Sequence, residues 1–223
     1  MSWTRFGLVI LASCALAALI VSTRKTEAVV EHRDARQLVL HYTLSRVDDP
    51  VIVVGDSIVE ASTLPRSSCG HPIVNAGLNG ASTASDLGNW LAPALDGKRA
   101  SLIVVSLGTN DALVDTPQSK KSFAERYGAL LAQLAGLSAR LAVLEILPVE
   151  ARGRMSAAMR DEVTETIRSY NSTLPEIAER NGATLIALPA MPAPHTIDGV
   201  HLNAGGSRVW EQAVMRAVEM ICG

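Results

Sequence analysis

Short apolar runs alternate with stretches of helical spacing over most of the chain. The runs are rich in β-branched residues and are bounded by Gly, Pro or polar residues, which is typical of buried strands. They cover residues 51–54, 72–75, 102–107, 141–147 and 183–188. Between them, apolar residues recur at helical spacing over residues 84–92, 119–137, 156–181 and 204–220. Near-continuous apolar strands that alternate with helices indicate a parallel sheet covered on both faces.

We therefore predict an α/β domain over residues 50–223, built as a three-layer α/β/α sandwich. Its five-stranded parallel sheet is expected to have flavodoxin-like topology. In open sheets of this kind, ligands bind beyond the carboxyl ends of the strands. The residues that directly follow each strand are thus the first candidates for function.

The N-terminal segment differs from the rest of the chain. Residues 6–23 carry no charged side chain, with Arg5 before them and Arg24 and Lys25 after them. This length is at the lower edge of what spans a bilayer, and it also fits the apolar region of a signal peptide cleaved after Ala28. We expect residues 1–23 to form a membrane anchor or a signal peptide. A buried helix of a soluble domain is the alternative, but such helices rarely lack a polar face.

The flanking charges leave two orientations open. Positive residues are more numerous after the apolar segment than before it, which by the positive-inside rule favours an anchor with a cytoplasmic domain. Acidic residues are interspersed among them, so we expect export, with the protein membrane-anchored, periplasmic or secreted. Residues 24–49 are expected to form a juxtamembrane helix and a linker. The helix should break before Pro50, because the residue before a proline is pushed out of the α region.

Composition narrows the class of protein. The net charge of −2 provides no basic surface for nucleic acid, and only 4% of the residues are aromatic. A stacking platform for bases or sugars is therefore not expected, and a substrate should be held in a small cleft. No Cys or His cluster has the spacing of a metal site, so we expect neither a metal nor a cofactor.

Four polar motifs follow the predicted strands or lie in the loop that precedes the last helix. They are Gly55-Asp56-Ser57, Asn75-Ala76-Gly77, Gly108-Thr109-Asn110-Asp111 and Asp198-Gly199-Val200-His201. Each motif has an ordinary structural explanation as a helix cap, a turn or a solvated loop. Their conjunction beyond one edge of the sheet indicates a catalytic site instead.

The residue types fit acyl transfer. A serine that begins a helix, as Ser57 does, places its hydroxyl and N–H at the positive end of the helix dipole, which suits a nucleophile. Asn110 offers a neutral amide donor for an oxyanion, and Gly77 lets the backbone approach a ligand closely. Asp198 can fold back to accept Nδ1–H of His201, which leaves Nε2 as the base.

Together the motifs resemble those of the SGNH/GDSL hydrolases, and the resemblance extends over about residues 50–221. It implies a catalytic triad of Ser57, His201 and Asp198, with an oxyanion hole formed by the N–H groups of Ser57 and Gly77 and the Asn110 side chain. The implied activity is that of an esterase, a lipase or a carbohydrate deacetylase, which acts through an acyl-enzyme without a cofactor. The substrate would be a small-molecule, glycan or lipid ester. The G-x-S-x-G motif of the other large serine hydrolase class would need glycine in place of Val59.

Alternative functions stay open at this point. An O-acyltransferase would use the same residues and differ only in its products. A non-catalytic binding module that has kept the fold would fail to react with fluorophosphonates. A nucleotide-binding flavodoxin-like domain fits less well, because neither a P-loop nor a G-x-G-x-x-G motif follows the first strand.

The remaining polar residues near the motifs receive structural interpretations. Asp56 and Asp111 are expected to brace their loops, and His195 is expected to have no catalytic role. Cys69 and Cys222 are the two cysteines of the predicted domain. A disulfide between them is compatible with flavodoxin-like strand order and would support an oxidising compartment.

Overall fold

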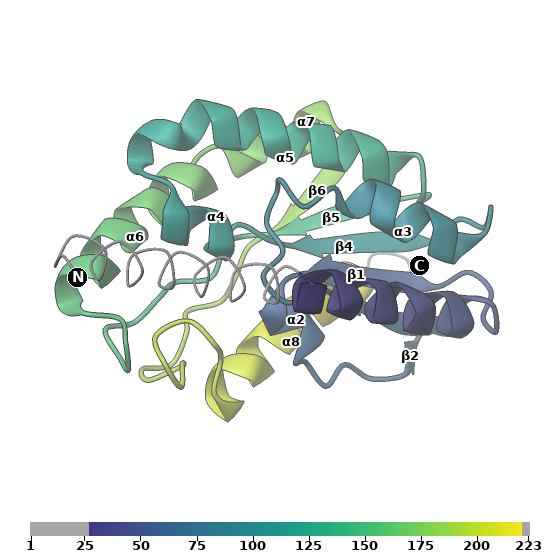
Figure 1. Ribbon diagram of the computed structural model, residues 1–223, viewed down its shortest axis with the longest axis horizontal. Helices are drawn as coiled ribbons and strands as arrows, with labels where there is room; N and C mark the ends of the chain where they lie inside the picture. The colour runs from purple at the N-terminus through teal and green to yellow at the C-terminus, as the bar shows by residue number, and fades with distance from the viewer. Residues whose placement is uncertain (1–26, 220–223) are drawn as a thin grey trace, which may run out of the picture. The chain divides into compact units, whose positions relative to one another are not determined.

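A central β-sheet organises the computed structural model, which describes residues 27–219 (Figure 1). The chain divides into one unit that ends at residue 39 and a second that begins at residue 40 and contains the sheet. A helix covers residues 27–44, and its last residues, Leu40 and Leu44, are buried in the core of the second unit. Within residues 27–219, no helix combines the length and the apolar character that crossing a bilayer requires. The predicted anchor or signal peptide, residues 1–23, lies outside the described residues.

The sheet has six strands in the order β2-β3-β1-β4-β5-β6. They are β1 (Val51–Gly55), β2 (Ser67–Ser68), β3 (His71–Gly77), β4 (Leu102–Ser106), β5 (Leu141–Leu144) and β6 (Ala183–Ile186). Five strands are parallel, as the apolar runs predict, and they have the flavodoxin-like order. The predicted count of five missed β2, a two-residue strand that pairs antiparallel with β3. Its two serines carry no apolar pattern that could reveal a strand.

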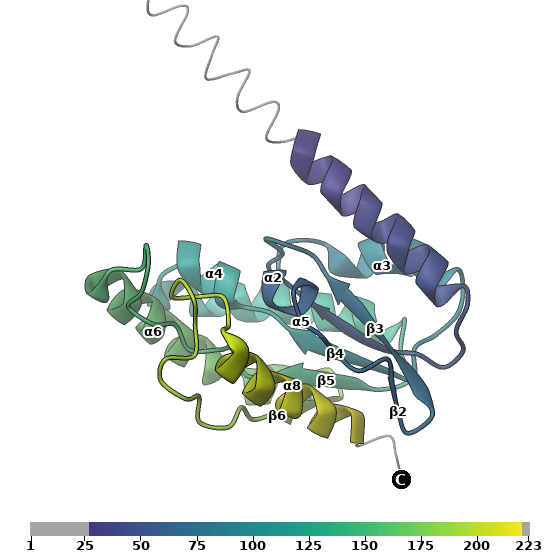
Figure 2. The ribbon, with the colours of Figure 1, turned by 90° about the horizontal axis from the view of Figure 1, so that it is seen from below.

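Helices cover both faces of the sheet. They are α2 (Ser57–Glu60), α3 (Leu87–Leu95), α4 (Thr109–Val114), α5 (Lys120–Ala135), α6 (Ala157–Asn171), α7 (Leu174–Arg180) and α8 (Ala204–Glu219), with a 3₁₀ turn at Pro117–Ser119. Alternate residues of β1 point to opposite faces: Ile52 and Val54 pack in the cluster that contains α3, α5, α6 and α7, whereas Val51 and Val53 pack with α2 and α8. Figures 1 and 2 show α8 across the sheet from α5. The three-layer prediction is confirmed.

The single helical stretch predicted over residues 156–181 is wrong in one respect, because it forms two helices. α6 ends at Asn171 and α7 begins at Leu174. Pro175 in the first turn of α7 has no N–H to continue the α6 ladder, and its ring would clash with the carbonyl four residues earlier. The hydroxyl of Thr173 donates to the carbonyl of Tyr170 at 2.6 Å, which closes the end of α6.

Tyr127 allows a test of what a buried hydroxyl group without a hydrogen bond costs in stability. Its ring is fully buried, and its hydroxyl has no hydrogen-bond partner in the described chain. Burial, together with the negative charges of Asp111 and Asp56, raises the pKa of Tyr127, so the hydroxyl stays neutral. An unsatisfied buried hydroxyl costs about 1–3 kcal/mol. We therefore expect Tyr127→Phe to raise the free energy of unfolding in urea by about 1 kcal/mol.

Tyr170→Phe is the matched control for this prediction. The Tyr170 hydroxyl donates to Oδ2 of Asp115 at 2.8 Å, so its removal should lower the free energy of unfolding. A loss of stability in Tyr127→Phe comparable to that in Tyr170→Phe would contradict the prediction.

Candidate active site

Ser57 is the first residue of α2 and lies just beyond the carboxyl end of β1. The N-cap of this helix is Asp56, whose Oδ1 accepts a hydrogen bond from the N–H of Ile58 at 2.9 Å. The Ser57 hydroxyl is therefore not the cap, and its Oγ lies 3.0 Å from Nε2 of His201. Of the two interpretations that the sequence left for Ser57, the helix cap is wrong and the nucleophile remains.

Gly55 allows the tight turn that positions Ser57. A Cβ at residue 55 would lie 2.2 Å from Cγ2 of Val59 and 2.5 Å from the carbonyl oxygen of Ser106. Neither distance is compatible with a side chain, so only glycine lets the end of β1 pass this close to α2 and to β4.

His201 lies in the loop between β6 and α8, 144 residues after Ser57. Its Nδ1 is 2.7 Å from Oδ2 of Asp198. The other carboxylate oxygen, Oδ1, accepts the N–H groups of Val200 at 3.0 Å and His201 at 2.9 Å. Asp198 thus holds both the turn and the ring. In this arrangement Nδ1–H faces the carboxylate, and Nε2 is left to accept the Ser57 proton.

Asp198 is ionised at neutral pH. Burial by itself would raise the pKa of this carboxyl group. The hydrogen bonds from the His201 ring and from the N–H groups of His201 and Val200 outweigh that effect and lower the pKa to about 2. A carboxylate that stays negative can stabilise the imidazolium formed when His201 takes up a proton.

Asn110 is the second residue of α4, beyond the end of β4. Its Nδ2 donates to the carbonyl of Ala81 at 2.8 Å, which fixes the orientation of the amide. Asn110, Ser57 and His201 line the same cavity. Because an Nδ2 group carries two hydrogens, one remains for a ligand in that cavity.

Gly77 does not have the free N–H that its predicted role requires. In the structure this N–H donates to Oδ1 of Asn75 at 2.9 Å. A Cβ at residue 77 would lie 2.1 Å from the backbone nitrogen of Glu60, so glycine is needed here for the packing of β3 against α2. Because its N–H is already bonded to Asn75, Gly77 is poorly suited to donate a hydrogen bond to an oxyanion.

Gly80 is the better placed glycine of the same loop. Its φ of 75° lies in the left-handed region, and its N–H makes no hydrogen bond within the described residues. The adjacent Asn79 lines the cavity that contains Ser57. Asn79 and Gly80 follow the second predicted strand, as Gly77 does, so the sheet-edge rule applies to them as well.

The cavity has a volume of about 480 Å³. Its lining includes the polar residues Ser57, Asn110 and His201, and Arg154 also lines the cavity. The apolar residues that line it are Leu113, Met155, Met159 and Val200. The cavity therefore contains the polar site residues together with apolar residues that can accommodate a small apolar group.

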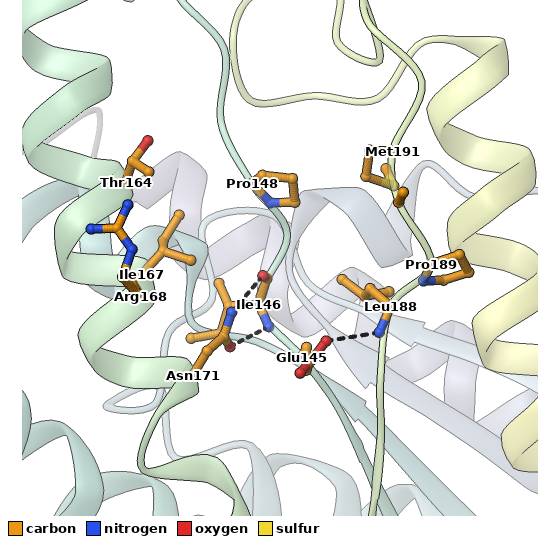
Figure 3. Close-up of a pocket in the computed structure, with 11 residues that line it drawn as sticks. Glu145, Ile146, Pro148, Thr164, Ile167, Arg168, Asn171, Leu188, Pro189 and Met191 are labelled. Carbon is orange, nitrogen blue, oxygen red and sulfur yellow. Dashed lines mark hydrogen bonds between the residues drawn. The ribbon is translucent and has the colours of Figure 1, made fainter.

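A second cavity, of about 360 Å³, lies between α6 and the segments that leave β5 and β6 (Figure 3). None of the predicted site residues lines it. In the described part of the chain, no three His, Cys, Asp or Glu side chains gather into a potential metal site. Cys69 is disulfide-bonded. Cys222 lies outside the described residues, so the pairing of these two cysteines stays a prediction.

Asp56 gives the site a pH-dependent stability. Burial, the largest effect, raises the pKa of Asp56 to about 6 from 3.8. A pKa raised in the folded state means that stability is complete below about pH 4 and is lost as the pH rises through 6. Asp56→Asn, whose amide oxygen can still cap Ile58, should therefore be more stable than the wild type at pH 8, by up to about 3 kcal/mol, with little gain at pH 4. Urea unfolding at both pH values measures this, and an equal effect at both would contradict it.

The fold and the site together define an α/β enzyme with a serine, a histidine and a carboxylate aligned at the carboxyl edge of its sheet. The chain belongs to the GDSL-like Lipase/Acylhydrolase family, whose model matches residues 53–209. Membership of this family makes the protein an ester-hydrolysing enzyme. A comparison with curated proteins finds no match.

Solved structures share the fold. A protein from Streptococcus pneumoniae named for platelet activating factor is 23% identical, with a TM-score of 0.72, over 92% of this chain and 99% of its own. An acetyl xylan esterase is 18% identical, with a TM-score of 0.58, over 76% of this chain and 99% of its own. A carbohydrate acetylesterase from Sinorhizobium meliloti is 20% identical, with a TM-score of 0.58, over 77% of this chain and 99% of its own. At these identities the likeness establishes the fold.

Proposed function

We propose that the protein hydrolyses carboxylic esters through an acyl-enzyme on Ser57, with His201 as general base and acid and Asp198 as its orienting partner. The observation that carries this proposal is the continuous contact from Ser57 Oγ to His201 Nε2 at 3.0 Å and from His201 Nδ1 to Asp198 at 2.7 Å. Both distances lie within the range that proton transfer and ring orientation require.

In the first half-reaction, Ser57 Oγ attacks the ester carbonyl carbon while its proton moves to Nε2 of His201. The carbonyl oxygen becomes an oxyanion, and its collapse expels the alcohol, which takes the proton from Nε2. In the second half-reaction, water attacks the acyl-enzyme by the same route. This releases the carboxylic acid and restores Ser57.

The oxyanion would be stabilised by three donors. We assign them to the N–H of Ser57, the N–H of Gly80 and Nδ2 of Asn110. The N–H of Ser57 lies in the first turn of α2, where backbone N–H groups have no partner within the helix. Gly80 replaces the predicted Gly77, because the N–H of Gly77 is bound to Asn75.

Asn110→Ala tests this oxyanion hole. Loss of one donor typically lowers turnover by about 100- to 1000-fold, because the transition state is stabilised more than the bound substrate. We expect that loss in kcat for an activated ester, with little change in KM. Asn89→Ala, at an exposed position on α3, is the control and should retain activity. A kcat for Asn110→Ala within about threefold of the wild type would remove Asn110 from the oxyanion hole.

The cavity supports a substrate with a short to medium acyl group. Its volume is about 480 Å³, and Leu113, Met155 and Met159 contribute apolar surface beside the reactive residues. The compared structures include an acetyl xylan esterase and a carbohydrate acetylesterase, which is consistent with small acyl groups. We also propose export of the protein, with residues 1–23 as anchor or signal peptide, because of their uncharged sequence.

A series of p-nitrophenyl esters of increasing chain length, assayed with the full chain, tests the function and the acyl preference together. We expect kcat/KM to peak at short to medium chains and a fluorophosphonate to add once per chain, at Ser57 by peptide mass spectrometry. No hydrolysis of any ester, combined with no labelling, would overturn the proposal.

A further inference from the structure

We propose that Glu150 and His195 are positioning residues. They would hold the loop that bears Asp198 and His201 in the position that places His201 beside Ser57. The inference rests on the proposed function, since it assigns these two residues a role in aligning the base. It concerns the segment between β6 and α8, which is long, carries two of the three side chains of the proposed triad and contains no helix or strand. A loop of this kind needs contacts from outside itself to keep a base within 3.0 Å of its serine.

The Glu150 carboxylate supplies the first of these contacts. Its Oε2 accepts the N–H of His195 at 3.0 Å, the N–H of Thr196 at 2.8 Å and the Thr196 hydroxyl at 2.5 Å. One oxygen thus satisfies two consecutive backbone donors and a side chain. Thr196 is completely buried and His195 is 6% exposed, so water could not easily replace these bonds.

The His195 ring supplies the second contact. Its Nδ1 lies 3.2 Å from Oε1 of Glu150, and its Nε2 lies 3.1 Å from the carbonyl oxygen of Pro148. Both neighbours are hydrogen-bond acceptors. Pro148 and Glu150 belong to the segment that follows β5. His195 therefore binds the base-bearing loop to that segment at two points.

Glu150 is charged in this setting. Burial by itself would raise the pKa of Glu150, but the hydrogen bonds from Thr196 and His195 and the charge of His195 outweigh it, and the pKa is lowered. Hydrogen bonds to an ionised acceptor are about twice as strong as those between neutral groups.

Backbone hydrogen bonds connect the loop around His195 and Thr196 to His201, the proposed base. The N–H of Ile197 donates to the carbonyl of His201 at 2.8 Å, and the N–H of Asn203 donates to the carbonyl of His195 at 2.8 Å. The two arms of the loop therefore pair on either side of the turn that carries Asp198. Glu150 also donates its own N–H to the carbonyl of Gly199, inside that turn, at 2.9 Å. A shift of residues 195 and 196 would move His201 relative to Ser57.

The segment after β5 is itself anchored, as Figure 3 shows. The Asn171 side chain, at the end of α6, accepts the N–H of Ile146 at 2.8 Å and donates to the carbonyl of Ile146 at 3.1 Å. Glu145 accepts the N–H of Leu188 at 2.9 Å, near the start of the same β6–α8 loop. Two glutamates of one segment thus bind the loop, but only Glu150 binds it beside the base. This makes Glu145 a matched control.

Glu150→Gln is the principal test, with Glu145→Gln as the control, both in the full chain. Gln is isosteric but neutral, so the three hydrogen bonds to its oxygen lose the charge assistance that the carboxylate provides. We expect kcat of Glu150→Gln to fall by about 10- to 100-fold with KM unchanged, as for a misplaced catalytic group. Its reaction rate with a fluorophosphonate should fall by the same factor. Glu145→Gln should keep kcat within about twofold of the wild type, even where its melting temperature falls.

A second pair of variants keeps the test decisive if Glu150→Gln does not fold. Thr196→Val removes one hydrogen bond to Glu150 with almost no change in shape, and Thr196→Ser restores the hydroxyl. We expect a lower kcat in the first variant and recovery in the second. A wild-type kcat in Glu150→Gln or, if that variant does not fold, in Thr196→Val, would overturn the inference. Equal losses in Glu150→Gln and Glu145→Gln would also overturn it.

Failure of the positioning role can be distinguished from failure of the proposed function. If Ser57→Ala and His201→Ala abolish hydrolysis while Glu150→Gln is fully active, the positioning role alone is wrong. If Ser57→Ala remains active, the proposed mechanism is wrong as well, and an effect of Glu150→Gln would need another explanation.

Discussion

Replacing Ser57 with alanine is expected to lower ester hydrolysis by about a millionfold and to abolish covalent labelling by fluorophosphonates. The side chain removed is the proposed nucleophile, whose Oγ lies 3.0 Å from Nε2 of His201. The variant should remain folded, because the cap of α2 is the Asp56 carboxylate and not the Ser57 hydroxyl. Initial rates with an activated ester and intact-protein mass spectrometry after labelling measure the two effects.

Ser62→Ala is a nearby control for this variant. The Ser62 hydroxyl donates to the carbonyl of Val59 at 2.7 Å, just after α2, and it does not line the cavity. It should label and hydrolyse at close to the wild-type rate. Retention of full esterase activity by Ser57→Ala would show that another residue is the nucleophile.

Asp198→Asn is expected to lower kcat by about 10,000-fold while the fold is kept. The amide oxygen can still accept the N–H groups of Val200 and His201, which Oδ1 accepts in the wild type. The NH₂ group then faces Nδ1 of His201 in place of Oδ2. It would donate to Nδ1 and leave the proton on Nε2, so the ring could no longer accept the Ser57 proton.

The pKa of Asp198 in the wild type determines over which pH range its carboxylate is charged. Because the pKa of Asp198 is lowered to about 2, the wild-type carboxylate is charged throughout the range in which ester hydrolysis is assayed. Protonation of Asp198 therefore contributes nothing to the pH dependence of the wild-type kcat in that range. A lowered pKa also means that the stability from this group is present above the ordinary pKa of 3.8 and is lost as the pH falls through 2.

The exposed Asp161 is a suitable control for Asp198, since its carboxylate pairs with Arg160 on the surface of α6. Asp161→Asn should retain wild-type kcat. If Asp198→Asn keeps more than about a tenth of the wild-type kcat, Asp198 does not fix the tautomer of the base.

The layers of the fold could be predicted because burial leaves a local pattern. Strand β1 lies between two layers of helices, so Val51 to Val54 are all apolar, and this run marks a parallel strand without any knowledge of its neighbours. The same pattern could not reveal β2, whose two serines form a strand only because β3 lies beside them.

The site was predictable as far as its geometry is local. Asp198 and His201 are three residues apart, so the turn between them brings carboxylate and ring together with little help from the rest of the fold. The glycine of the oxyanion hole could not be chosen in this way. Gly77 ends β3 and Gly80 lies three residues further on, and the hydrogen bond from the Gly77 N–H to Asn75 distinguishes them.

His195 shows most clearly where sequence reasoning ends. The sequence assigned it no catalytic role, and it does not line the cavity. Its importance comes from Glu150 and Pro148, which are 45 and 47 residues away along the chain. Nothing in the local pattern around His195 reports a partner at such a separation.

The sequence by itself determined the alternation of strands and helices, the sheet edge at which the candidate site residues lie, and the residue types that fit acyl transfer. These follow from burial and from contacts between residues close along the chain. Only the tertiary structure decided that Ser57 meets His201 across 144 residues and that Glu150 holds the loop of the base. Such contacts depend on how the sheet brings separate loops together, and no short stretch of sequence contains that information.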